Sequence, residues 1–73
     1  MIVKPVEKAA EQYVKKSTMA FLEGEKNLKW ITGVLAHSGL SREGTISVIG
    51  PLRNYGDNTR AQALFDWLGS ANW

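Results

Sequence analysis

The chain contains no cysteine and only one histidine, His37, so neither a disulfide nor a conventional structural zinc site can stabilise it. A structural zinc ion takes about four nitrogen or sulfur ligands, and this sequence offers one imidazole. The chain also lacks an apolar run near the roughly 18 residues that cross a bilayer. Because 73 residues form only a small core, we expect a single domain, residues 1–73. Such a domain would fold by hydrophobic packing, alone or with a partner's help, and carry no metal or cofactor.

Disulfides are rare in the reducing cytoplasm, and no signal-peptide hydrophobic region follows the first basic residue. We therefore expect a cytoplasmic protein. The chain also lacks a strong excess of either charge, because it has nine Lys and Arg residues and seven Asp and Glu residues, which gives a net charge of +2. A dedicated nucleic-acid-binding protein usually concentrates Lys and Arg on one face. Here acids and bases are interspersed, so nucleic acid stays open as a partner but is not favoured.

Apolar residues recur at steps of three and four in three segments, which is the period of an amphipathic helix. The first predicted helix covers about residues 5–22, and proline is tolerated in its first turn. The second begins near Leu28 and ends before Gly39. The third covers about residues 59–69, where Thr59 and Gln62 form a capping box.

Between the second and third segments the period changes. Residues 45–49 alternate polar and apolar side chains, are rich in β-branched residues and end at Gly50-Pro51, a pattern that predicts a short strand and a turn. Residues 52–55 would return as its hairpin partner. We therefore predict a compact α+β domain of three helices with a short β-hairpin packed against them. The alternative is an all-α fold, in which a short helix follows Ser41 and breaks near Pro51.

The sequence gives little support for catalysis. A nucleophile needs a base within hydrogen-bond reach. His37 and Ser38 do not form such a pair by adjacency, because neighbouring helical residues point in different directions. Glu23 and Glu25 lie in a predicted solvated turn, and no phosphate-binding glycine loop is present. We predict a protein that is not an enzyme.

Residues 35–47 suggest one alternative function, a helix-turn-helix that binds DNA. Gly39 would occupy the turn, and a polar cap would open the recognition helix. The candidate DNA-contacting residues of this alternative are Ser41, Arg42, Thr45, Ser47 and Arg53. Gly44 inside the recognition helix and Gly50-Pro51 at its end depart from the motif. We therefore favour a helix cap followed by a strand in this segment.

Aromatic residues and lysines are the candidates for contacts with a protein partner. Tryptophan and tyrosine are over-represented among interface hot spots, and lysines give the first helix a basic side. The candidate residues are Trp67, Trp73, Tyr55, Trp30, Lys8, Lys15 and Lys16. Packing over an incomplete core is an equally good interpretation of the aromatic residues. Residues 1–3 and 46–48 are two further candidates, because each stretch would accept a peptide strand from a partner.

In its length, lack of cysteine and mixed charge, the chain resembles small bacteriophage-encoded proteins that bind host bacterial RNA polymerase and alter transcription initiation or termination. The resemblance lies in the overall character of the chain and assigns no residue a role. It implies a regulator that inhibits transcription or prevents termination in the cytoplasm of a bacterial host. We accordingly expect a protein-binding regulator. A DNA-binding transcription factor and a homodimeric structural protein are the alternatives.

Overall fold

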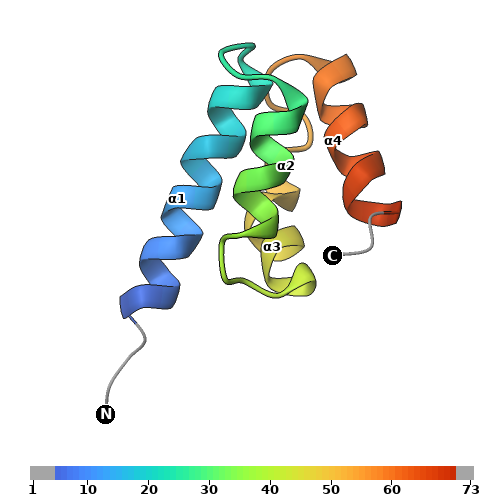
Figure 1. Ribbon diagram of the computed structural model, residues 1–73. Coiled ribbons are helices and arrows are strands. Elements are labelled where there is room, and N and C mark those ends of the chain that lie inside the picture. Colours follow the sequence, from blue (N-terminus) through green and yellow to red (C-terminus); the bar gives the residue numbers. More distant parts are fainter. Residues whose placement is uncertain (1–4, 71–73) are drawn as a thin grey trace.

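The computed structural model describes residues 5–70, with side chains from Lys8 onward, and every regular element in that range is helical. The elements are α1 (Pro5–Leu22), α2 (Leu28–Ala36), α3 (Arg42–Ile49), the 3₁₀ helix η1 (Gly50–Leu52) and α4 (Asn58–Ser70). Helices α1 and α2 lie side by side and run in opposite directions, α3 packs behind them, and α4 stands beside α2 (Figure 1).

The predicted α+β fold is wrong, because the segment expected to form a hairpin is α3 followed by η1. The Ser41 side chain caps α3 by accepting a hydrogen bond from the backbone N–H of Gly44 at 2.9 Å. Thr45 and Ile49, four positions apart, are both fully buried on one side of the helix. Burial of this stripe outweighs the strand preference of the β-branched residues. The all-α alternative, with a helix after Ser41 that breaks near Pro51, describes the fold correctly.

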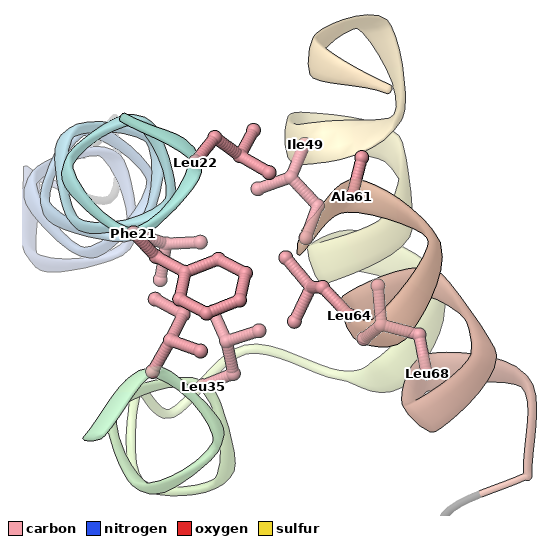
Figure 2. Packing of buried hydrophobic residues seen from close by; sticks show 9 residues of the cluster. Phe21, Leu22, Leu35, Ile49, Ala61, Leu64 and Leu68 are labelled. Carbon is pink, nitrogen blue, oxygen red and sulfur yellow. The ribbon is translucent and has the colours of Figure 1, made fainter. Parts of the chain in front are cut away.

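All four α-helices contribute to one hydrophobic core. Figure 2 shows the Phe21 ring of α1 pointing into the space between the helices, toward side chains of α2 and α4. The buried hydrophobic residues are Val14, Phe21, Leu22, Ile31, Leu35, Ile49, Ala61, Leu64 and Leu68. Among the α1 side chains described, from Lys8 onward, the first buried one is Val14, and the ribbon of the preceding turns extends past the other helices (Figure 1).

Helix α4 begins one residue before the predicted capping box, and its cap is a different side chain. The Asp57 carboxylate accepts hydrogen bonds from the backbone N–H groups of Thr59 (2.7 Å) and Arg60 (3.2 Å). A carboxylate at this position satisfies N–H groups that have no partner within the helix and interacts favourably with the helix dipole. Asp57, and not Thr59, therefore sets the start of α4.

Two arginines hold the carboxyl ends of helices. Arg42 of α3 donates to the carbonyls of Leu68 (2.8 Å) and Gly69 (2.7 Å) in the last turn of α4. Arg60 of α4 donates to the carbonyl of Phe21 at 2.6 Å and to the carbonyl of Lys26. The last carbonyls of a helix lack the donor that earlier ones find four residues on, and the Phe21 carbonyl also accepts from the backbone N–H of Gly24 at 3.0 Å. The two guanidinium groups thus supply links between distant segments in a domain that has no disulfide.

The segment between η1 and α4 is fastened to the end of α1. Gly56 has a φ of +71°, and a Cβ at this position would lie 2.5 Å from the carbonyl oxygen of Leu22. The next backbone N–H, that of Asp57, donates to the same oxygen at 3.1 Å. The Tyr55 hydroxyl donates to the Glu23 carboxylate. Only glycine combines this backbone conformation with such a close approach.

Candidate functional site

The aromatic residues proposed as partner anchors contribute mainly to packing. Trp30, Tyr55 and Trp67 are each half-buried and pack against the core. The Trp30 ring also has the Lys26 ammonium 5.3 Å from its centre. Trp73 lies outside the described residues. The structure therefore favours the packing interpretation for the three aromatics that it places.

The backbone of residues 35–47 agrees with the DNA-binding alternative in its order of elements, but most of the side chains named for base contacts are buried or engaged elsewhere. Helices α2 and α3 flank a turn in which Gly39 has a φ of +88°, so the segment has the element order of a helix-turn-helix. Arg42, however, is bound to the carbonyls of α4, and Thr45 is fully buried. The Arg53 guanidinium stacks on the Phe65 ring at 4.8 Å. A major-groove helix needs exposed side chains that donate to base edges.

Among the residues named for that alternative, Ser47 alone is exposed and makes no side-chain contact within the described range. Ser41 is also exposed, but its side chain caps α3. The one charged side chain that α3 exposes is Glu43, an acid. The strand-addition candidate at residues 46–48 is also wrong, because these residues are helical. The other candidate, residues 1–3, lies outside the described residues.

His37 and Ser38, two of the side chains considered for catalysis, bind the backbone of α2. His37 donates from Nδ1 to the carbonyl of Gly33 at 3.0 Å, and the Ser38 hydroxyl donates to the carbonyl of Leu35 at 3.0 Å. The pair is therefore used as helix-end contacts. Within residues 8–70 no group of three or more His, Cys, Asp or Glu side chains is placed to hold a metal ion. No helix of the described range is long and apolar enough to cross a membrane.

The lysines proposed on the first helix form the basic side of α1. Lys8, Lys15 and Lys16 are exposed. None of the hydrogen bonds or ring contacts in the described part of the chain involves their side chains. Three engaged cations, Arg42, Arg53 and Arg60, lie on α3, α4 and the segment between them. Within the described helices, three of the exposed lysines without such a contact lie on α1, and Lys29 lies on α2.

A groove of about 270 Å³ lies between this side of α1 and helix α3, and it is lined by Lys8, Glu11, Gln12, Lys15 and Val48. Lys8, Gln12 and Lys15 follow one another at steps of four and three, so they lie along one stripe of the helix. Val48 of α3 is half-buried and is the one apolar residue of the lining. Sequence reasoning found the two lysines, and the helical spacing would have indicated Gln12. The position of Val48 depends on how α3 packs against α1.

A larger hollow, of about 530 Å³, lies where the α1–α2 connection meets the start of α4. Its lining includes Glu25, Lys26, Thr59 and Arg60. Both cations of this hollow are engaged, because the Arg60 guanidinium binds two backbone carbonyls and the Lys26 ammonium lies over the Trp30 ring. We therefore take the α1–α3 groove, with its basic border, as the better candidate site.

Comparison of the chain with protein-family models, with curated proteins and with solved structures finds no significant match. The assignment of function accordingly depends on the residues and geometry described above.

Proposed function

We propose that this domain is a non-enzymatic protein-binding regulator and that the basic side of α1 is its contact surface. The observation that carries the proposal is that three exposed lysines gather on α1, Lys8, Lys15 and Lys16, and that their side chains make no contact within the described residues. The arginines and aromatic residues described above are instead used within the fold. Long side chains left without intramolecular contacts are available to a partner of opposite charge.

The magnitude of the charge effect indicates what else the partner must do. An exposed ion pair contributes only about 0.2–1 kcal/mol, so three lysines alone give weak binding. A specific protein interface buries in total at least about 1,000 Å². The partner must therefore cover the neighbouring surface of α1 and α3 as well. Complementary charge would then speed association and fix the orientation of the complex.

Bacterial RNA polymerase is the first partner to test, because the chain resembles small phage-encoded proteins that bind it. In this proposal the domain alters transcription through a protein contact and does not read DNA sequence. The absence of a free cation on α3 supports the preference for protein over DNA.

The experiment compares two charge-reversed variants that each change the net charge by the same amount. Lys15→Glu alters the basic side of α1, and the control Lys29→Glu alters an exposed lysine of α2 that makes no side-chain contact in the described range. Binding of each variant to purified RNA polymerase and to duplex DNA is measured by fluorescence anisotropy at two salt concentrations. We expect the α1 variant to lose polymerase binding and the control to keep it. Equal losses in both variants, or tight salt-sensitive binding to DNA alone, would contradict the proposal.

A further inference from the structure

From the geometry of the α1–α3 groove we infer that its occupant is an acidic amphipathic helix of a partner protein, which places two carboxylates on either side of one apolar side chain. This inference rests on the proposed function and specifies the chemistry of the partner. The volume of about 270 Å³ lies just below the range of typical small-molecule pockets, about 300–1,000 Å³. The groove therefore suits a protein side chain better than a free ligand.

The spacing of the groove residues sets the pattern of the partner. Lys8 and Lys15 are seven positions apart on α1, which corresponds to about 10 Å along the helix axis. Val48 contributes the apolar part of the lining, and Gln12 offers both a donor and an acceptor. A second helix laid along α1 has the same rise per residue. Acidic residues at positions i and i+7 with an apolar residue at i+3 or i+4 would thus meet the two lysines and Val48 together.

Glu11 makes the groove selective. Its exposed carboxylate is part of the same lining, so a third acid in the middle of the partner helix would meet a like charge. An apolar residue at that point avoids the repulsion and contacts Val48 instead. Selectivity of this kind depends on a repulsive element as well as on the attractive ones.

The test uses a synthetic alanine-based helical peptide with Glu at positions i and i+7 and Leu at i+4. Binding to the full-length ¹⁵N-labelled chain is followed by NMR chemical-shift changes. Because the contact consists of two exposed ion pairs and one apolar contact, we expect a dissociation constant of about 1 mM or weaker. The shifts should be largest at the groove residues. A matched peptide with Gln in place of both Glu residues should bind several-fold more weakly.

Three variants of the chain make the result specific. Lys15→Glu should weaken peptide binding by about 5-fold or more, and Lys29→Glu should leave it unchanged. Glu11→Gln removes the like charge and should strengthen binding of a peptide that carries a third, central Glu by about 2- to 5-fold. Unchanged binding in Lys15→Glu, shifts located away from the groove, or concentration-dependent groove shifts without peptide would overturn the inference. The last result would indicate a second copy of the chain as the occupant.

The two proposals fail separately. If charge reversal on α1 abolishes polymerase binding and the peptide does not bind the groove, the proposed function stands and the occupant is wrong. If the peptide binds as expected and polymerase does not, the groove inference stands and the choice of partner is wrong.

Discussion

Replacement of Arg60 with alanine should destabilise the domain far more than the usual substitution of a surface residue. The side chain makes two charge-assisted hydrogen bonds to backbone carbonyls, and its guanidinium lies 4.5 Å from the centre of the Phe21 ring. Hydrogen bonds to charged groups contribute about 1.5–3 kcal/mol each, and a cation–π contact about 0.5–1 kcal/mol at an exposed site. Water can reach the carbonyls after truncation, so we expect a loss of about 2–4 kcal/mol.

This loss is large relative to the stability that a small core supplies, about 3–5 kcal/mol. Arg60→Lys keeps the charge, but an ammonium group cannot reproduce the planar fork that reaches both carbonyls, so an intermediate loss of about 1–2 kcal/mol is expected. Arg53 provides the matched control. Its guanidinium stacks on Phe65 at 4.8 Å, and the described residues show no hydrogen bond from this side chain. Arg53→Ala should therefore cost only about 0.5–1 kcal/mol.

The measurement is urea unfolding followed by tryptophan fluorescence and by circular dichroism. With a slope of about 1 kcal/mol/M for a chain of this size, Arg60→Ala should lower the midpoint by about 2 M or more. Arg53→Ala should lower it by less than about 1 M. If the two alanine variants had the same midpoint, the guanidinium contacts with Phe21 and Lys26 would not stabilise the fold as argued here.

Three further predictions concern the core and the segment that precedes α4. Gly56→Ala should lower the free energy of unfolding by about 2–4 kcal/mol, because the added Cβ would meet the α1 backbone. Gly39 is the control, because its φ is also positive but a Cβ there would lie in open space, so Gly39→Ala should cost only about 1–2 kcal/mol in the same urea titration. Thr18→Val should raise the thermal midpoint, with a gain of about 1 kcal/mol, because the fully buried Thr18 hydroxyl has no hydrogen-bond partner among the residues that the structure describes. An unchanged or lower midpoint would show that the hydroxyl is satisfied. The hydrogen bond to Glu23 raises the pKa of Tyr55 above its ordinary value of 10.0, so its stabilising effect is complete below that pH and is lost as the pH rises through the raised pKa. Melting temperatures of wild type and Tyr55→Phe should therefore converge at high pH, and a constant difference would contradict the assignment.

The helical periodicity of the sequence located α1, α2 and α4 correctly, whereas α3 was predicted as a strand. The error has a physical cause, because residues 45–49 both alternate in polarity and are rich in β-branched side chains. The features that decide for a helix are the Ser41 cap and the burial of Thr45 with Ile49. The cap was visible in the sequence as part of the helix-turn-helix alternative. The burial depends on packing against other helices.

The candidate site was predicted in part. The lysines of α1 were recognised because charged residues at helical spacing are visible in a sequence. The roles of Arg42 and Arg60 were not, because each reaches backbone carbonyls 26 or more positions away. No local pattern marks such contacts. For the same reason the sequence left both a core and an interface interpretation open for Trp30 and Trp67, since their packing depends on elements distant in the chain.

The separation in sequence between each arginine and the carbonyls that it binds also has a consequence for folding kinetics. Arg42 reaches Leu68 across 26 positions, and Arg60 reaches Phe21 across 39. Contacts between distant segments carry a larger loop-closure entropy than those within or between adjacent helices, so they are expected to form late in folding. Interactions absent from the transition state affect the unfolding rate and leave the folding rate nearly unchanged. We therefore expect both arginines to slow unfolding of the native state while leaving the folding rate nearly unchanged.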